Sequence, residues 1–237
     1  MVKPMELQES KNIINESQNI YLIASEEPEA ITSALALFYT LKDLGKNVNL
    51  VVDTLPKNLK FIAPSLDFIS YPKNFVISVP NSVAKISQIY YEKNDEALKI
   101  HLTLDSGNIK KDNVSFYFSE AKPNLIITVG VKDFAKELPT KLNSFGFLLD
   151  SPILNIDHSQ DNEKFGKINL LGENSLAEII GGLAETKSSQ TAHCLLASLV
   201  IYTENFRKNQ TAEIFQMTAD LMKRGADLKE ITNNIKA

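Results

Sequence analysis

Two neighbouring side chains with chemically useful groups stand at the end of an apolar run. Asp157 and His158 follow Ile153-Leu154-Asn155-Ile156, a short segment typical of a buried strand. A carboxylate and an imidazole at a strand end can bind a metal ion, and they can equally hydrogen-bond neighbouring loops without any metal. Asp161 and Asn162, a few residues on, are types that cap or turn a chain. Both interpretations of the pair are open at this point.

A second group of acidic residues precedes and begins a helical pattern. Glu26, Glu27 and Glu29 follow the apolar run 19–24, and the helical pattern extends from Glu29 to about Leu44. Acidic side chains are favoured before and within the first turn of a helix. A structural role therefore explains these residues as simply as a binding role does.

The elements around these residues predict an α/β domain. Residues 47–52 form a second apolar run after the helix, and strand, helix and strand in this order indicate a parallel βαβ unit. Leu125-Ile126-Ile127-Thr128-Val129 adds a further buried strand. Asp133 is expected to be the N-cap of a short helix from about Phe134 to Leu138, which Pro139 ends. We predict a doubly wound, mainly parallel sheet.

Between residues 74 and 124 the pattern changes to alternation, which indicates antiparallel hairpins. The strand-like segments are residues 85–91, 98–104 and 114–118. Aromatic side chains in these segments could stack on nucleic-acid bases, but the packed face of a sheet is the interpretation we favour. They are Tyr90, Tyr91, Phe116 and Phe118.

The last third of the chain is helical in pattern, in blocks at about 175–186, 189–204, 210–224 and 227–236. Cys194, the one cysteine, lies among apolar residues of the second block and is expected to be a buried thiol. His193 precedes it, but adjacent helical residues point in different directions, so a Cys/His nucleophile pair is not expected.

Composition excludes several classes of function. The chain has 237 residues, 43% of them hydrophobic, and a net charge of -4. It contains no extended Lys/Arg-rich stripe, which argues against a large duplex DNA partner. No apolar run approaches the roughly 18 residues of a membrane span, and the start of the chain is not a secretory signal. We therefore expect a cytoplasmic protein without a membrane partner.

These motifs together resemble the DHH phosphoesterase superfamily. Asp157-His158-Ser159, with Asn162 downstream, is similar to the Asp-His-His motif of that family with its second His replaced. Ser33-Ala34-Leu35-Ala36-Leu37 resembles the family's first helix, and Leu221-Met222-Lys223-Arg224-Gly225-Ala226-Asp227 resembles a late helix end. The resemblance extends over nearly the whole chain and implies a fold of DHH type.

The resemblance also implies a site for two divalent ions, usually manganese, that clamp a phosphate and generate the attacking hydroxide. Most of the corresponding positions carry altered ligands, since apolar, glycine, serine and tyrosine residues replace several of them. If any metal binds, the resemblance assigns it to Glu27, Glu29, Asp157 and His158. The full set of corresponding positions is Ile23, Glu27, Glu29, Gly130, Asp157, His158, Ser159 and Tyr202.

The expected domain organisation follows from the same resemblance. Residues 1–208 form a DHH-like α/β domain that contains the inserted hairpin region 74–124, and residues 209–237 form a helical connector. The substrate-binding domain that follows in the family is absent from this sequence.

We expect a catalytically impaired protein that binds a nucleotide or another protein. The alternative is an active manganese-dependent phosphodiesterase or phosphatase acting on short oligonucleotides, cyclic dinucleotides or 3′-phosphoadenosine 5′-phosphate, as related families do. The first interpretation requires no cofactor, and the second requires Mn²⁺. Expected partners are a small phosphorylated ligand or short oligonucleotide, and a second copy of the chain bound through the inserted hairpins.

Overall fold

A computed structural model of the chain describes residues 3–52, 55–63, 73–120, 122–137, 151–183 and 188–235. The chain divides into two compact units. The larger unit comprises Met1–Tyr71 and Lys122–Ala237, and the smaller unit comprises Pro72–Ala121.

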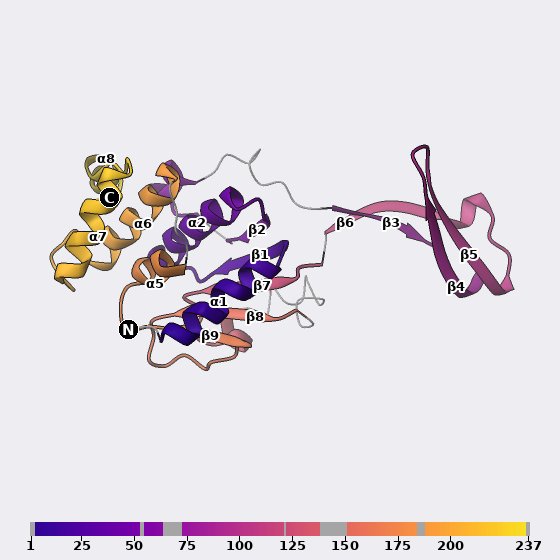
Figure 1. Cartoon of the computed structure of the whole chain (residues 1–237), viewed down its shortest axis with the longest axis horizontal. Helices are drawn as coiled ribbons and strands as arrows, with labels where there is room; N and C mark the ends of the chain where they lie inside the picture. The colour runs from indigo at the N-terminus through magenta and orange to yellow at the C-terminus, as the bar shows by residue number, and fades with distance from the viewer. Residues whose placement is uncertain are drawn as a thin grey trace. The chain divides into compact units, whose positions relative to one another are not determined.

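A five-stranded parallel sheet forms the centre of the larger unit (Figure 1). Its strands are β1 (Asn19–Ala24), β2 (Asn47–Val51), β7 (Leu125–Val129), β8 (Ile153–Asp157) and β9 (Ile168–Leu171). Their order across the sheet is β2-β1-β7-β8-β9, so β1 pairs with β2 on one side and with β7 on the other. Both faces are covered, which explains why β1 and β7 are apolar along most of their length. The predicted parallel α/β sheet is confirmed.

Helices cover one face of the sheet, and further helices pack on them. α2 lies between β1 and β2 in the chain and contacts both, while α1 and α5 contact β9 and β8. α6 packs on α2, where Ser33 Oγ and Ser198 Oγ lie 2.7 Å apart in a buried contact, and α7 and α8 pack on α6. The bounds are α1 (Pro4–Glu16), α2 (Pro28–Asp43), α5 (Leu176–Leu183), α6 (Ser189–Tyr202), α7 (Ala212–Lys223) and α8 (Leu228–Ile235), with a 3₁₀ turn η1 (Lys57–Ile62).

A smaller apolar cluster covers the other face of the sheet. It contains Tyr21 and Ile23 of β1 together with Ile126 of β7. Phe134, in the one-turn helix α3 (Phe134–Glu137), and Phe165 pack against it, with their ring centroids 5.2 Å apart. The predicted capping by Asp133 is confirmed, because Oδ1 of Asp133 accepts hydrogen bonds from the N–H groups of Ala135 and Lys136. The predicted helix end at Leu138 and Pro139 lies outside the described residues.

The smaller unit contains two antiparallel pairs of strands, β3 with β6 and β4 with β5 (Figure 1). Their bounds are β3 (Lys73–Ser78), β4 (Ala84–Lys93), β5 (Leu98–Gly107) and β6 (Ser115–Glu120), with a 3₁₀ turn η3 (Lys111–Asn113) between β5 and β6. The predicted antiparallel hairpin region is therefore confirmed. Strand β3 was not among the predicted strands.

The packed-face interpretation of the aromatic residues in this unit is wrong. Tyr90, Tyr91 and Phe116 are 52%, 72% and 59% exposed. The side chain of Phe118 lies outside the described part of the structure. Alternation correctly indicates which residues share a face of a strand, but it does not establish that another layer covers that face.

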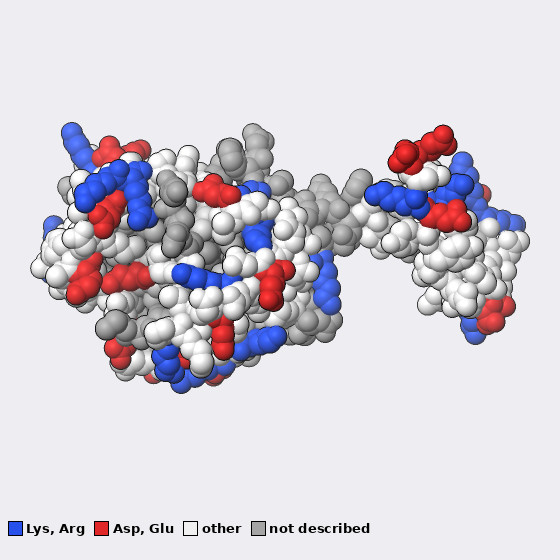
Figure 2. Space-filling view, in the orientation of Figure 1, with Lys and Arg blue, Asp and Glu red and all other residues white. Residues whose placement is uncertain are grey.

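The surface carries mixed charges, as the absence of a Lys/Arg-rich stripe in the sequence predicts. On the face shown in Figure 2, Lys and Arg side chains lie among Asp and Glu side chains rather than in one basic area. Among the residues that the structure describes, none of the helices combines the length and the apolar character that crossing a membrane requires.

Candidate strand-end site

The loops after β1, β7 and β8 meet at the carboxyl end of the sheet. β1 is the strand at which the chain order of the sheet reverses, and open α/β sheets commonly bind ligands at such a point. Hydrogen bonds join the loops, since Ser25 N–H donates to Val129 O (3.0 Å) and Gly130 N–H donates to Ile156 O (2.9 Å). The fold therefore brings the loops that carry most of the predicted site positions to one edge of the sheet.

Asp157, at the end of β8, is held by hydrogen bonds to both carboxylate oxygens. Its Oδ1 accepts from the His158 N–H and its Oδ2 accepts from Asn162 Nδ2, both at 2.8 Å. Asp157 is 1% exposed. The backbone and an amide side chain thus satisfy this carboxylate from within the protein.

Asn162 connects Asp157 to the sheet. Its Nδ2 also donates to Val131 O (2.9 Å), and its Oδ1 accepts from Asn155 Nδ2 (2.8 Å) and Lys164 N–H (2.8 Å). Asn155 in turn accepts a hydrogen bond from Thr128 Oγ1 of β7. This network of buried polar side chains ties three neighbouring segments together. The signal for it in the sequence is Asn155 itself, a polar residue within an apolar strand.

His158 and Glu29 form the one charged contact between the predicted metal-binding side chains for which the structure gives a distance. His158 Nε2 lies 3.6 Å from Glu29 Oε2, and the two side chains are 26% and 12% exposed. Glu29 Oε1 accepts the N–H of Leu176, the first residue of α5, at 2.8 Å. Burial raises the pKa of the Glu29 carboxyl, although His158 and the Leu176 N–H act in the opposite direction. Glu29 therefore holds the start of a helix that lies 147 positions away in the sequence.

Gly130 stands where the resemblance places a carboxylate, and the structure leaves no room for a side chain there. A Cβ atom at this position would lie 2.7 Å from Ala30 Cβ and 3.0 Å from Ser25 Oγ. Gly130 also has φ of +69°, a conformation that favours glycine. The packing of α2 against the loop after β7 is thus built around a glycine.

Neither Glu27 nor Ile23 takes part in the Glu29–His158 contact. Ile23 is buried in the second apolar cluster, 1% exposed. The Glu27 side chain is 64% exposed, and its Oε1 lies 3.7 Å from Lys132 Nζ. Glu27 is also the N-cap residue of α2, where an acidic side chain is favoured by the helix dipole.

Glu29, Asp157, His158 and Asn162 form what we call the strand-end cluster. Two further predicted positions, Tyr202 and Ser159, lie beside it and have structural roles. Tyr202 packs its ring edge-on against His158, with centroids 5.9 Å apart. Ser159 Oγ accepts a hydrogen bond from Asp161 N–H (3.3 Å), which closes a local turn. After Tyr202, Glu204 has φ of +47°.

These donors do not fit a centre for two divalent ions. Such a centre needs several carboxylates and imidazoles that converge on ions about 3.5–4 Å apart. Here both carboxylate oxygens of Asp157 accept hydrogen bonds from the protein, Glu29 is shared between Leu176 and His158, and position 130 has no side chain. Throughout the described residues, no group of three or more His, Cys, Asp or Glu side chains is placed to hold a metal ion.

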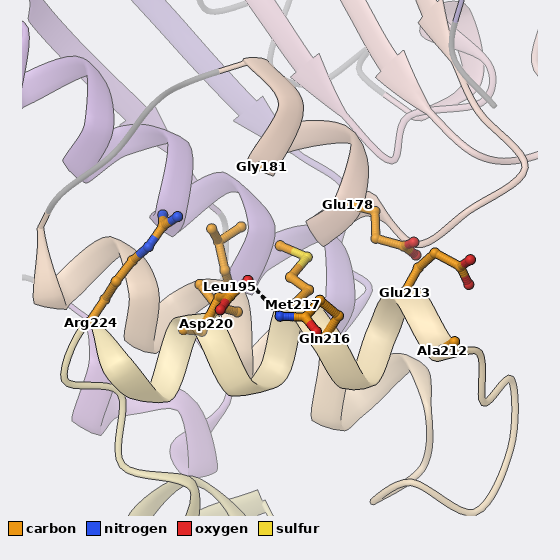
Figure 3. A pocket seen from close by; sticks show the side chains of 10 residues that line it. Glu178, Gly181, Leu195, Ala212, Glu213, Gln216, Met217, Asp220 and Arg224 are labelled. Carbon is orange, nitrogen blue, oxygen red and sulfur yellow. Dashed lines mark hydrogen bonds between the residues drawn. The ribbon is translucent and has the colours of Figure 1, made fainter.

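Two cavities are lined by residues outside the loops after β1, β7 and β8. A groove of about 640 Å³ is formed by α5, α6 and α7, and Figure 3 shows Gln216 donating a hydrogen bond to Asp220 within it. Hydrogen bonds from Gln216 and Lys223 lower the pKa of the Asp220 carboxyl. The groove is lined by Glu178, Gly181, Leu195, Ala212, Glu213, Gln216, Met217, Asp220, Leu221 and Arg224.

The second cavity, of about 230 Å³, includes His193 and Cys194 in its lining. His193 Nε2 lies 3.5 Å from Glu230, and burial raises the pKa of the Cys194 thiol. The prediction of a buried thiol is confirmed.

Comparison with known proteins agrees with the fold and the motifs. No family model matches the chain. The chain is 25% identical over 226 residues to the bifunctional oligoribonuclease and PAP phosphatase NrnA of Thermus thermophilus, a match that covers 92% of this chain and 53% of the relative. The chain thus spans about half the length of this curated relative.

A solved structure shares the fold. An exopolyphosphatase-related protein from Bacteroides fragilis matches with a TM-score of 0.67 at 14% identity, over 99% of this chain and 61% of that one. The two proteins therefore share an α/β fold. The sequence relative and the shared fold agree with the resemblance to the DHH phosphoesterase superfamily that the motifs indicate.

Proposed function

We propose that this chain is a non-catalytic DHH-type protein that works by binding a partner, and that its strand-end cluster is a structural part of the core. One observation carries the proposal. Glu29, whose Oε2 lies 3.6 Å from His158 Nε2, accepts the N–H of Leu176 with its other carboxylate oxygen, and position 130 is a glycine. A residue that the resemblance assigns to a metal instead caps a helix.

The state of each remaining donor supports the same conclusion. The two oxygens of Asp157 already accept hydrogen bonds, so an ion would share them with the His158 N–H and the Asn162 amide, and any rotation of the carboxylate would weaken these bonds. Leaving a buried donor unsatisfied costs about 1–3 kcal/mol. Metal binding would therefore compete with the interactions that hold the loops together.

The charge at the strand ends favours a protein partner over a phosphorylated ligand. A helix N-terminus attracts anions, but Glu27 and Glu29 place carboxylates at the start of α2. Without a cation these carboxylates repel a phosphate group. Binding of a small phosphorylated ligand or of a short oligonucleotide is thus the less favoured form of the proposal.

Calorimetric titration of the metal-free protein with Mn²⁺ tests the proposal directly, because it does not depend on choosing a substrate. We expect no saturable binding up to about 1 mM, a concentration at which a site with that dissociation constant would be half filled. The doubly substituted Asp157→Asn, His158→Gln chain is the matched control.

Hydrolysis is measured on the same preparations with a short oligoribonucleotide and with 3′-phosphoadenosine 5′-phosphate. The NrnA relative, assayed beside them, provides the positive control. We expect equal, background rates for the unsubstituted and doubly substituted chains. Micromolar Mn²⁺ binding that the double substitution abolishes, or turnover that it abolishes, would establish an active phosphoesterase and refute the proposal.

A further inference from the structure

One face of the β4–β5 pair is apolar over its central part. Cross-strand partners place Ile89 opposite Leu102 and Tyr91 opposite Ile100 on this face. The opposite face carries polar neighbours such as Glu92 opposite Lys99. We call the apolar side the hairpin face; it consists of Ile86, Ile89, Tyr91, Leu98, Ile100, Leu102 and Leu104.

The hairpin face is exposed. Tyr91, Ile89 and Leu98 are 72%, 69% and 60% exposed, and Figure 2 shows broad uncharged surface in the region of β4 and β5. Among residues 75–117, whose side chains the structure describes, Ala84 alone is buried. A two-stranded pair is marginally stable in water by itself and gains stability when a hydrophobic face is covered. A face of this size on a soluble chain marks an interaction surface.

The composition of the hairpin face restricts what can cover it. Its centre contains no charged side chain, and the charged residues on this face lie at its two ends, where Lys93 is opposite Leu98 and Lys85 is opposite Ser106. Charge steering and ion pairing therefore contribute little at its centre, so the partner surface is expected to be apolar. In the larger unit, the exposed large apolar residues that the structure describes are Met5 of α1, Leu44 after α2, and Phe215 and Met222 of α7. In the smaller unit, the β3–β6 pair also exposes Phe75, Ile77 and Phe116. The apolar surface that matches the hairpin face in extent and composition is the hairpin face of a second copy.

The area agrees with a dimer. Complete burial of a large aliphatic or aromatic side chain removes roughly 60–120 Å² of apolar surface at the usual transfer coefficient. Because none of the seven side chains is fully exposed, they supply at most roughly 400–800 Å² per copy, against about 800 Å² per partner in a standard interface. We propose that two copies of this chain pack their hairpin faces against each other about a two-fold axis, as the two layers of a small β-sandwich. This inference does not depend on whether the strand-end site binds metal.

Sedimentation equilibrium of the full chain tests the proposal from about 1 to about 100 µM, a range that brackets a micromolar dissociation constant. The expected mass at the upper end is twice the 26.4 kDa of the chain. Ile100→Lys places a charge in the centre of the hairpin face and is expected to weaken the dimer at least about tenfold. Thr103→Lys is the matched control, because it adds the same charge to the same strand on the polar face.

Cross-linking locates the contact. Cys194 is the one cysteine and is buried, so a new cysteine on the hairpin can be read against a low background. A short thiol-specific cross-linker is expected to join two Ile100→Cys chains efficiently and two Thr103→Cys chains weakly. Circular dichroism of each variant establishes that it has folded.

Three results would overturn the proposal. The first is a single-chain mass at every concentration, which would assign the hairpin face to another partner. The second is a dimer that Ile100→Lys and Thr103→Lys affect equally. The third is equal cross-linking of the two cysteine variants. None of these results bears on Mn²⁺ binding, so failure here and failure of the proposed function are distinguishable.

Discussion

The strand-end cluster encloses polar residues, whereas the hairpin face exposes apolar ones. In the cluster, residues that could carry chemistry are enclosed and hydrogen-bonded to the protein, as Asp157 and Asn162 are. On the hairpin face, residues that could form a core are exposed, as Ile89 and Tyr91 are. The comparison teaches that residue type suggests a role and that the partners of the side chain decide it.

This difference has energetic consequences for substitutions. In the cluster a polar side chain is part of the folding free energy, because its removal leaves buried donors or acceptors unpaired. On the hairpin face an apolar side chain contributes little to folding of the single chain, since it is exposed before any partner binds. Substitutions in the cluster should therefore change the free energy of unfolding. Substitutions on the hairpin face should instead change the association of two chains.

The largest expected effect is at Gly130. Gly130→Ala should lower the free energy of unfolding by roughly 3 kcal/mol, since a left-handed residue costs about 1–2 kcal/mol and overpacking costs a further 1–3 kcal/mol. Gly45→Ala is the matched control, because Gly45 has φ of +72° with nothing within 4 Å of its would-be Cβ. It should lose only about 1 kcal/mol.

Equilibrium urea unfolding measures the difference between the two glycine variants. Gly130→Asp, which restores the carboxylate implied by the family resemblance, should be at least as unstable as Gly130→Ala. Equal losses at Gly130 and Gly45 would mean that the loop after β7 has room for a side chain, and the description of a closed cluster would then fail.

An intermediate effect is expected at Asn162. Asn162→Ala removes the side chain that joins Asp157, Val131 and Asn155, and should cost about 2 kcal/mol because several buried groups lose a partner. Asp161→Ala changes the neighbouring residue, whose side chain is exposed, and should change stability by less than about 0.5 kcal/mol. Thermal and urea unfolding of the two variants test this. A loss at Asp161 equal to that at Asn162 would show that the loop as a whole, rather than the network, sets the stability.

Much of the larger unit could be predicted from its sequence because burial leaves a local pattern. The apolar runs of β1, β2, β7 and β8, and the periodicity of α2, follow from a sheet covered on both faces. α1 was missed, since only Ser10 and Ile14 of its thirteen residues are buried and no broad apolar stripe marks it.

The sequence was sufficient to predict which metal ligands are missing from the site, but not which interactions take their place. Ile23 and Gly130 cannot ligate a metal whatever the fold, so the sequence was sufficient for them. The hydrogen bond from Leu176 N–H to Glu29 joins residues 147 positions apart, and no local pattern encodes it. The exposure of Tyr91 could not be predicted either, because a strand has the same alternating sequence pattern with or without a covering layer.

The smallest expected effect, at Glu29, tests whether the cluster uses a carboxylate as a charge or only as a hydrogen-bond acceptor. Burial raises the pKa of Glu29 above its ordinary value of 4.5, so the folded chain holds this proton more tightly than the unfolded chain. The stabilisation from this proton is complete below about pH 4.5 and is lost as the pH rises through the folded-state pKa. Glu29→Gln does not titrate, and its stability relative to the unsubstituted chain should therefore increase with pH above about 4.5.

The Gln side chain retains an acceptor for the Leu176 N–H, whereas Glu29→Ala removes it and should cost about 1 kcal/mol across the range. Urea unfolding of the three chains between about pH 4 and 8 separates these cases, because that range spans the ordinary pKa of a carboxyl group and values above it. If Glu29→Gln is as unstable as Glu29→Ala at neutral pH, the cluster requires a negative charge. The strand ends would then need a bound cation to balance this charge. They would no longer be a closed region, in contrast to the open hairpin face.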